Sequence, residues 1–413
     1  MKSDLDRLMK ERELDGLWIT GSPGDNPSMD YFIGDAHITR ADVIKKRGQP
    51  AVLYHGPMER EEAESTGLKT ELETPSRLMA DLEEAQGDEF SAAAMRIQRN
   101  LEAQGISGRV AVYGRWEAGR TLAVIRHLEE RMPSCQFVND SGPEGALRQA
   151  RLTKDEGEIE KIRHMGRVTV DVVAGIAEYL QTRPVVNEVL QNESGDPLTV
   201  GQVKNRLHLM LAERGAESPS GPIFAPGREG ALGHGTGLPD QQIRLGEPIV
   251  FDLYPRARGG GYYYDFTRTW CLGYAPTEVG ELYDQVHQVY HQVFDMLVAG
   301  ASPRQLQIEV CQRFENLGHP TPLSDPNTQV GYFHGLAHGL GLAIHEAPIF
   351  RHYDNPAEMP LQPGMVVTYE PGLYYPERSM GVRLEDAVLI EPEGAPTVLA
   401  EYPHDLVLPM KSA

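Results

Sequence analysis

The sequence predicts an α+β fold made of two domains, which cover residues 1–146 and 147–413. Two observations lead to this prediction. In the first part, helical patterns alternate with short strand patterns, which is typical of an α/β sheet covered by helices. From Ile223 onward, short β-rich runs alternate with glycine, which indicates hairpins. A turn cluster at residues 141–145 separates the two parts and gives the expected boundary.

The N-terminal domain is expected to begin with a helix and then a strand. Leu5, Leu8 and Met9 have helical spacing, and residues 17–20 form a short apolar run. Further strands are expected at residues 51–54 and 110–113, and helices at residues 59–65, 90–104 and 117–130. The histidines of this domain are isolated from one another, so packed or surface positions are expected for His37, His55 and His127. No catalytic group is predicted here.

The C-terminal domain is expected to begin with two helices. Residues 147–180 are rich in charge and carry Ile159, Ile162 and Met165 on one side, which predicts one long helix. Residues 183–197 predict an irregular surface loop, and residues 200–214 predict the second helix.

The composition excludes several classes of partner. The 413 residues are 40% hydrophobic and 24% charged, as in soluble globular proteins. A formal net charge of −21 opposes binding to nucleic acid and to anionic membranes. No apolar run approaches the ~18 residues that span a bilayer, and the chain opens on a helical pattern rather than a signal core, so a cytoplasmic protein is expected. Three cysteines without a C-x-x-C pair predict unpaired thiols.

Residues 366–390 predict a β-hairpin that carries two glutamates. Apolar, β-rich runs flank a Pro-Glu-Arg-Ser turn, and opposed residues of such a ladder have a constant sum of residue numbers. Glu370 then lies opposite Glu385, and the alternation of side chains places Tyr374 and Arg383 on the same face. Two carboxylates so close together repel each other unless a proton or a cation lies between them. A metal ion is the expected partner.

Residues 249–270 predict another hairpin, with its tip at Arg258 and Gly259. A loop with an even number of residues places Asp252 opposite Asp265 on one face. A glycine lies six positions before the first acid of each hairpin, so the two hairpins look like related units. Two hairpins with paired carboxylates indicate a site for two divalent cations.

Three histidines lie in the glycine-rich apolar stretch of residues 332–348: His334, His338 and His345. The stretch is not an H-E-x-x-H motif, because no second histidine follows His345 at the required spacing. Beside four paired carboxylates, His338 is predicted to be a metal ligand.

Five residues, in this order, resemble the metal ligands of the pita-bread metallopeptidases: Asp252, Asp265, His338, Glu370 and Glu385. That family includes methionine aminopeptidase, Xaa-Pro aminopeptidase and prolidase. The local sequences agree as well, as in Glu-Pro-Gly-Leu-Tyr at Glu370 and Gly-Val-Arg-Leu-Glu-Asp at Glu385. The resemblance covers residues 147–408 and implies a pita-bread catalytic domain with a curved antiparallel sheet. The N-terminal part resembles the creatinase-like domain of the proline-directed branch.

The resemblance implies an activity and a cofactor. The activity is hydrolysis of the peptide bond before proline, with a hydroxide that bridges two divalent cations as the nucleophile. Manganese is expected, and cobalt, zinc or iron would also suit an oxygen-rich set with one imidazole. Glu370 would bridge the metals and serve as the general acid and base. A homodimer is also implied.

The remaining roles follow from the same resemblance. His345 and His234 would hold the substrate and stabilise the tetrahedral intermediate. His334 would line the proline pocket. Arg383, with Tyr374 on its face of the hairpin, would contact the substrate. The spacing between the two aspartates is two residues longer than the family usually has, and an insertion of two keeps both on one face.

The substrate expected is a small peptide with proline at the second position. A dipeptidase is favoured, because Arg383 could accept the free carboxylate of proline. An Xaa-Pro aminopeptidase on longer peptides stays open. A metal-free creatinase-like hydrolase and a non-catalytic binding module stay open too, although the complete ligand set argues against both.

Overall fold

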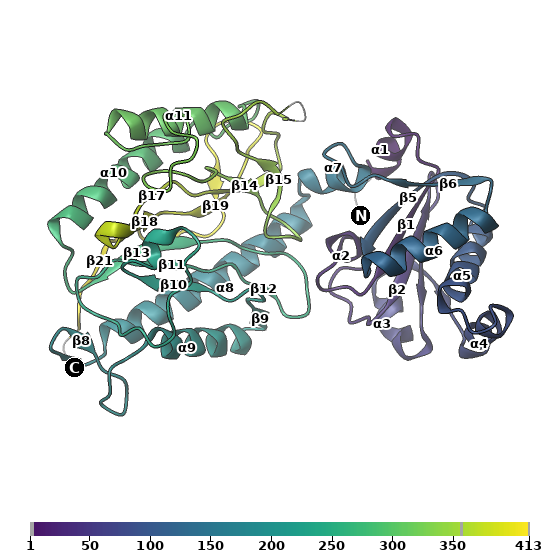
Figure 1. Cartoon of the computed structure of the whole chain (residues 1–413), viewed down its shortest axis with the longest axis horizontal. Helices are drawn as coiled ribbons and strands as arrows, with labels where there is room; N and C mark the ends of the chain where they lie inside the picture. Colours follow the sequence, from purple (N-terminus) through teal and green to yellow (C-terminus); the bar gives the residue numbers. More distant parts are fainter. Residues whose placement is uncertain (1–3, 356–357, 412–413) are drawn as a thin grey trace. The chain divides into compact units, whose positions relative to one another are not determined.

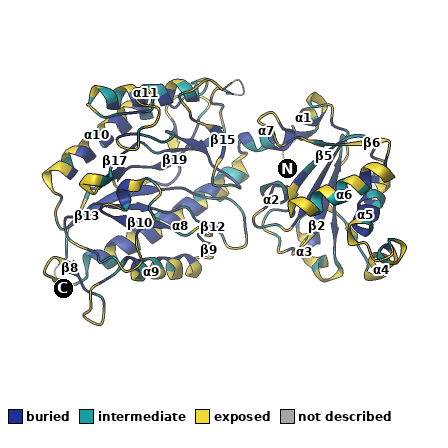
Figure 2. Ribbon diagram, in the orientation of Figure 1, coloured by how far each residue is buried: buried dark blue, intermediate teal, exposed yellow. Residues whose placement is uncertain are grey.

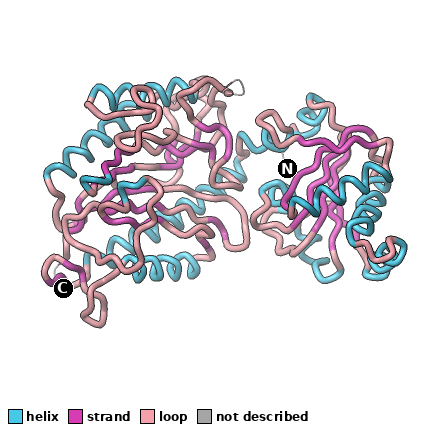
Figure 3. The backbone as a smooth tube through the Cα atoms, viewed as in Figure 1, coloured by secondary structure: helices cyan, strands magenta, loops and turns pink. Residues whose placement is uncertain are grey.

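The structure is a computed structural model that describes residues 4–355 and 358–411. It forms two compact units, Met1–Arg151 with Gly259–Gly261 and Leu152–Arg258 with Tyr262–Ala413. Both contain helices and sheets, which confirms the predicted α+β class (Figure 3). These units are defined by internal packing. The expected domain boundary between residues 146 and 147 stays a prediction. Over the described ranges, no helix is long and apolar enough to cross a membrane.

The first unit is a mixed six-stranded sheet with the strand order β4-β3-β2-β1-β5-β6 (Figure 1). Its strands are β1 (Gly16–Gly21), β2 (Ala41–Lys46), β3 (Ala51–His55), β4 (Lys69–Leu72), β5 (Gly108–Arg115) and β6 (Cys135–Asn139). Its helices are α1 (Leu5–Glu11), α2 (Pro27–Ile33), α3 (Arg60–Ser65), α4 (Pro75–Glu84), α5 (Glu89–Ala103) and α6 (Ala118–Arg131), with a 3₁₀ turn η1 (Pro57–Glu59). The strands and helices expected in this region are confirmed. His37 is exposed and His55 is buried.

Strand β2 was not predicted, because its pattern is interrupted by charged residues. Asp42 is buried, yet it accepts hydrogen bonds from the Trp18 indole at 2.9 Å and from the Arg96 guanidinium at 2.9 Å. Lys45 is buried as well and pairs with Asp6. Buried charges of this kind need partners from distant segments, which a local pattern does not reveal.

The second unit contains a four-stranded sheet and a five-stranded sheet, with the orders β10-β11-β13-β21 and β15-β14-β16-β19-β20. The strands of the first sheet are β10 (Ile223–Pro226), β11 (Ile249–Asp252), β13 (Thr267–Leu272) and β21 (Val407–Leu408). Those of the second are β14 (His338–Gly339), β15 (Glu346–Ile349), β16 (Val366–Tyr369), β19 (Asp386–Leu389) and β20 (Thr397–Val398). Neighbouring strands are antiparallel except β13 and β21.

Short ladders and helices complete this unit. The ladders are β7 (Val185–Val186) with β8 (Val189–Leu190), β9 (Ala216–Glu217) with β12 (Arg256–Ala257), and β17 (Gly372–Tyr375) with β18 (Met380–Arg383). The helices are α8 (Glu156–Gln181), α9 (Val200–Glu213), α10 (Thr277–Phe294) and α11 (Pro303–Asn316), with 3₁₀ turns η2 (Gly230–Leu232) and η3 (Pro376–Arg378). Helix α7 (Ala146–Leu152) belongs to the first unit except for its last residue.

The strands pack between two pairs of helices, with one hydrophobic layer on each face of the strands. Figure 1 shows α8 and α9 along one side of the strands and α10 and α11 along the other. Consecutive residues of β16 divide between the layers, since Val366 belongs to the cluster with α8 and α9 and Val367 to the cluster with α10 and α11. The strands are therefore buried on both faces, as Figure 2 shows, and the site must lie at their ends.

The long helix expected over residues 147–180 is wrong, because the chain breaks between α7 and α8. Asp155 caps α8 by accepting from the Glu158 N–H, while the Glu158 carboxylate accepts from the Asp155 N–H. This capping box competes with helix continuation and starts a new helix. The expected irregular loop over residues 183–197 is also corrected in part, since β7 and β8 form a hairpin around Asn187 and Glu188, which have positive φ.

The glutamate hairpin has the predicted register but is divided into two ladders. Val366 pairs with Leu389, and Gly372 pairs with Arg383, so the sum of residue numbers is the predicted one throughout. Pairing stops between β16 and β17, where Pro371 follows Glu370, and Glu385 instead forms a bridge to Thr267. The two glutamates therefore leave the sheet at the point where its ladders separate.

The aspartate hairpin differs from its prediction in register. Asp252 pairs with Thr267 rather than with Asp265. Gly259, Gly260 and Gly261 all have positive φ, so the tip lies one residue later than expected. The sum of the numbers of paired residues is two larger than predicted. A shift by two keeps both aspartates on the same face of the hairpin, but they are diagonal neighbours and not directly opposed.

Candidate metal centre

All five predicted ligands lie at strand ends in the second unit. Asp252 ends β11, His338 begins β14 and Glu370 directly follows β16. Asp265 precedes β13 by two residues, and Glu385 lies between β18 and β19. The structure brings all five to the wall of one cavity of about 790 Å³.

Three of these side chains form a compact group. Asp265, His338 and Glu385 each offer a ligand atom, and the three atoms lie within 4.8 Å of one another. His338 Nε2 lies 3.6 Å from Asp265 Oδ2 and 3.5 Å from Glu370 Oε1. All three members of the compact group are buried.

The hydrogen bonds of His338 define its tautomer. Its Nδ1 lies 3.1 Å from the carbonyl oxygen of Gly339, and because a carbonyl only accepts, Nδ1 carries the proton. Burial, together with the neighbouring His345, lowers the pKa of His338 to about 3. The ring is therefore neutral, and the lone pair of Nε2 faces the carboxylates. This is the form in which histidine binds a metal ion.

The buried carboxylates are electrostatically unfavourable without a cation. Burial raises the pKa of Asp265 and of Glu385 well above the usual range, and repulsion from the neighbouring acids adds to this effect. Burial likewise raises the pKa of Glu370 to about 8. Few hydrogen bonds compensate. Thr267 Oγ1 donates to Glu385 at 2.6 Å, Thr368 Oγ1 donates to Glu370 at 3.3 Å, and the Phe266 N–H donates to Asp265 at 3.1 Å.

Asp252 differs from the other acids because it has a cationic partner. Its Oδ2 accepts from Arg383 Nη2 in a short, buried ion pair, while its Oδ1 is buried and has no hydrogen-bond partner among the described residues. Burial raises the pKa of Asp252, and the Arg383 charge opposes that rise. Oδ1 is thus an unsatisfied buried acceptor, which a cation could bind.

The residues present therefore fit divalent cations. Four carboxylates and one neutral imidazole are oxygen-rich ligands with a single nitrogen, which suits manganese, cobalt, iron or zinc. The compact group and the unpaired Asp252 Oδ1 supply the acceptor atoms. A cation would also relieve the repulsion that raises the carboxylate pKa values.

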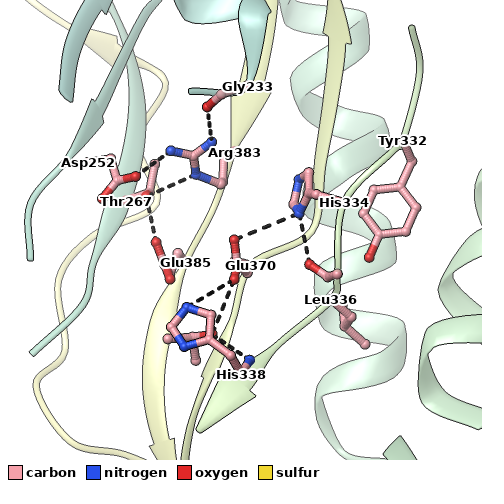
Figure 4. A network of polar contacts seen from close by, with 12 residues as sticks. Gly233, Asp252, Thr267, Tyr332, His334, Leu336, His338, Glu370, Arg383 and Glu385 are labelled. Atoms are coloured by element: carbon pink, nitrogen blue, oxygen red, sulfur yellow. Dashed lines mark hydrogen bonds and ion pairs between the residues drawn. The ribbon is translucent and has the colours of Figure 1, made fainter. Parts of the chain in front are cut away.

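The predicted substrate residues divide into two groups. His234, His334, His345 and Arg383 line the cavity, whereas Tyr374 is fully buried. The Tyr374 hydroxyl donates to His334 Nε2 at 2.9 Å and accepts from Arg383 Nη1 at 2.9 Å. The structure therefore makes Tyr374 a positioning residue behind two residues of the cavity wall. Figure 4 shows this region, with the imidazoles of His334 and His338 directed toward Glu370.

Arg383 is bound mainly by the protein itself. Its Nε donates to Thr267 Oγ1 at 3.2 Å, its Nη1 donates to the Gly233 carbonyl at 3.2 Å, and its Nη2 donates to Asp252 (Figure 4). Nη1 also donates to the Tyr374 hydroxyl. Of the five N–H groups of an arginine, one on Nη2 stays available. The guanidinium thus ties the two hairpins together.

Two residues of the site were missed by the sequence reasoning. Thr267 bonds both Glu385 and Arg383, and its place in the Asp-Phe-Thr motif was a signal that could have found it. Arg351 lines the cavity and is exposed, and no ion pair of its guanidinium is found within the described chain. Nothing in its local sequence distinguishes it from a surface arginine.

Comparisons with known proteins agree with this geometry. A family model described as Metallopeptidase family M24 matches residues 160–392. The chain is 27% identical over 402 residues to a protein of Pyrococcus furiosus named Xaa-Pro dipeptidase, covering 96% of this chain and 97% of the relative.

Two solved structures share the fold. The prolidase from Pyrococcus horikoshii OT3 has a TM-score of 0.72 at 22% identity, and the X-Pro aminopeptidase from Thermotoga maritima has a TM-score of 0.73 at 20% identity. Each comparison covers 98% of both chains. At this identity the likeness concerns the fold alone, and it includes both units.

Proposed function

The chain belongs to metallopeptidase family M24, and on this basis we propose that it hydrolyses the bond before proline in Xaa-Pro dipeptides. The family membership confirms the resemblance found in the sequence and makes the protein a peptidase. The name of the full-length relative from Pyrococcus furiosus supports the choice of substrate.

One observation carries the proposal: three buried acids, the half-buried Glu370 and one neutral histidine converge on a single cavity. We assign Asp252, Asp265, His338, Glu370 and Glu385 as the ligands of two divalent cations, with manganese as the physiological metal. When bound, such cations would lower the pKa of a water molecule and polarise the scissile carbonyl.

Glu370 is the proposed general acid and base. Its carboxylate faces His338 and His334 at 3.5 and 3.8 Å and lines the cavity, so its proton can be exchanged with a bound substrate. Burial raises the pKa of Glu370 to about 8 in the cation-free site, and bound cations would oppose this rise, so that the carboxylate is ionised and able to accept a proton. It would take the proton of the attacking water and deliver it to the proline nitrogen.

The histidines of the wall are proposed to hold the substrate. His234 and His345 are exposed residues that line the cavity, so both can donate to the carbonyl oxygen as it gains negative charge. His334 is oriented by the Gly335 carbonyl, which accepts from Nδ1 at 2.8 Å, and by Tyr374. Its imidazole face would contact the proline ring.

The free carboxylate of a dipeptide needs a cationic partner in the cavity. Arg383 has one N–H left, whereas Arg351 lines the cavity and its guanidinium forms no ion pair within the described residues. A bidentate contact between carboxylate and Arg351, with Arg383 as a second donor, would favour dipeptides over longer chains. An Xaa-Pro aminopeptidase is the second candidate, because the aminopeptidase from Thermotoga maritima has the same fold.

A comparison of Ala-Pro with Ala-Pro-Gly tests the proposal. Wild-type protein loaded with Mn²⁺ should release proline from Ala-Pro and cut Ala-Pro-Gly at least tenfold more slowly. Arg351→Ala should reduce this preference, and Arg258→Ala, a change outside the cavity lining, should keep it. Cleavage of the tripeptide alone would establish the aminopeptidase, and inactivity on both peptides would reject the proline-directed function.

We also propose that the protein is a cytoplasmic homodimer. Unpaired thiols support the first part, since all three cysteines are free and buried. Sedimentation of the metal-loaded protein tests the second.

A further inference from the structure

A second group of histidines lies on another part of the second unit, and we propose that it binds a divalent transition cation such as Zn²⁺. His287 and His291 lie one turn apart on α10, and His404 lies in the segment between β20 and β21. One ring nitrogen of each lies within 4.8 Å of the others. None of the three lines the cavity of the candidate metal centre.

The two helical histidines are already close to the geometry of shared ligands. His287 Nε2 and His291 Nε2 are 3.0 Å apart. Nitrogen atoms bound to one tetrahedral Zn²⁺ at about 2.0–2.1 Å lie roughly 3.3 Å apart. A cation therefore requires only a small outward movement of two rings, of which His291 is exposed.

The third histidine is oriented by a buried carboxylate. His404 Nε2 lies 3.2 Å from Asp386 Oδ2, and Asp386 also accepts from Arg268 Nη2 at 2.8 Å and from the Tyr290 hydroxyl at 2.7 Å. Because a carboxylate only accepts, the His404 proton lies on Nε2, and the lone pair of Nδ1 is left for a cation. A carboxylate behind a histidine is the usual support of a metal-binding imidazole.

The protonation of the rings agrees with ligation. Burial is the main cause that lowers the pKa values of His287 and His291. The proximity of His404 lowers both pKa values further. Each neutral imidazole keeps one lone pair. The hydrogen bond between the two Nε2 atoms places the proton of one ring on Nε2, so a cation would bind both Nε2 atoms once this proton has moved to the Nδ1 of that ring. Three nitrogen donors favour zinc, nickel, copper or cobalt over manganese, whereas the catalytic set is rich in oxygen.

The site has room for a further ligand. A cavity of about 590 Å³ lies beside it, and its wall includes His291, His404, Asp386 and Arg268. Three protein ligands with an open fourth position allow water or a small anion to complete the coordination. The cation would be exchangeable rather than permanently enclosed.

A bound cation would join two distant parts of the chain. His404 follows Tyr402 and Pro403, whose carbonyls accept from the buried Arg268, and its own carbonyl accepts from the Tyr283 hydroxyl at 2.5 Å. Arg268 also donates to the Glu385 carbonyl at 2.8 Å. Cross-linking α10 to this segment would therefore stabilise the support of one catalytic ligand. Without a cation, the same contacts are only hydrogen bonds that pack the segment on α10.

Zinc content separates these two cases. Wild type, His291→Ala and the control His208→Ala, an exposed histidine on α9, are stripped with chelator, equilibrated with micromolar Zn²⁺ and analysed by mass spectrometry. The catalytic centre is present in all three proteins, so it cancels in the comparison. We expect His291→Ala to hold one zinc equivalent fewer than wild type and than His208→Ala. Equal zinc in wild type and His291→Ala, or the same loss in His208→Ala, would overturn the proposal.

Thermal unfolding gives a second readout that does not depend on peptidase activity. Ligands that bind only the folded state raise the Tm. Zn²⁺ should raise the Tm of wild type and His208→Ala by several degrees more than that of His291→Ala. Because His291 is exposed, its replacement leaves the core intact, and circular dichroism verifies the fold. An equal rise in all three proteins would contradict a cation at this site.

Discussion

The two acid-bearing hairpins differ in what neutralises their carboxylates. Asp252, on the aspartate hairpin, is paired with Arg383, which comes from the glutamate hairpin. Asp265, Glu370 and Glu385 form no ion pair with a lysine or an arginine within the described residues, and burial raises the pKa of each. The protein thus supplies a cation for one acid and none for the other three, for which we propose metal ions as partners.

The hairpins also differ in their backbones. The glutamate hairpin keeps its predicted register and releases both glutamates where its two ladders separate. The aspartate hairpin is longer and turns on three glycines with positive φ, which shifts Asp265 away from a position opposite Asp252. The four acids of the proposed metal site therefore reach the cavity through a break in the ladder of one hairpin and a register shift in the other.

The largest effect is expected for the acid that has both ligand and proton-transfer roles. Glu370→Ala should lower kcat on Ala-Pro by at least about 1,000-fold, because it removes a metal ligand together with the general acid and base. Steady-state kinetics and metal analysis on the same preparation check this. Substantial turnover by a folded, metal-loaded Glu370→Ala protein would exclude the proposed role.

The next effect concerns the cation that the protein supplies itself. Arg383→Met should destabilise the protein by about 3–5 kcal/mol, because Asp252 would be left buried without its partner. Urea unfolding measures the change. Arg351→Met is the matched control, since Arg351 is exposed in the same cavity, and it should change stability by less than about 0.5 kcal/mol. Similar losses of stability in both variants would show that the loss in Arg383→Met does not come from the broken ion pair with Asp252.

The acids without a protein cation should make the metal-free protein sensitive to pH. Where the folded-state pKa of an acid is raised, the folded state keeps a proton that the unfolded state releases. The contribution of such an acid to the free energy of unfolding is fully present below about pH 4.5. It is lost as the pH rises toward about 8, the pKa of Glu370.

The slope should reach about 1.4 kcal/mol per pH unit for each such group. Urea unfolding of chelator-treated protein at several pH values measures it, and Glu370→Gln should reduce the slope by about one proton. An unchanged slope in that variant would mean that Glu370 does not titrate in this range.

The smallest effect is expected behind the cavity wall. Tyr374→Phe removes the hydroxyl between His334 and Arg383 but keeps the ring, so kcat/KM for Ala-Pro should fall about tenfold. The zinc and manganese content should not change, because Tyr374 is not a proposed ligand. A loss of metal in this variant would show that the hydroxyl supports the ligand set and not the substrate.

Much of the site could be predicted from the local amino-acid sequence, and the rest depends on contacts between distant segments of the chain. The register of the glutamate hairpin follows from its turn residues, and the five proposed ligands, which line one cavity, were found from their local sequences. The slip of the aspartate hairpin depends on which of three glycines forms the tip. The pair between Asp252 and Arg383 joins residues 131 positions apart, and no local pattern encodes it. The same reason explains why Arg351 was missed.

The direct test of the central claim is metal-dependent release of proline. Chelator-treated wild-type protein should leave Ala-Pro intact, and the addition of Mn²⁺ should restore hydrolysis. Asp265→Asn, with its carboxylate replaced by an amide of similar size, should need far more Mn²⁺ for the same rate. Proline release by the metal-free protein, or none by the metal-loaded protein, would contradict the account.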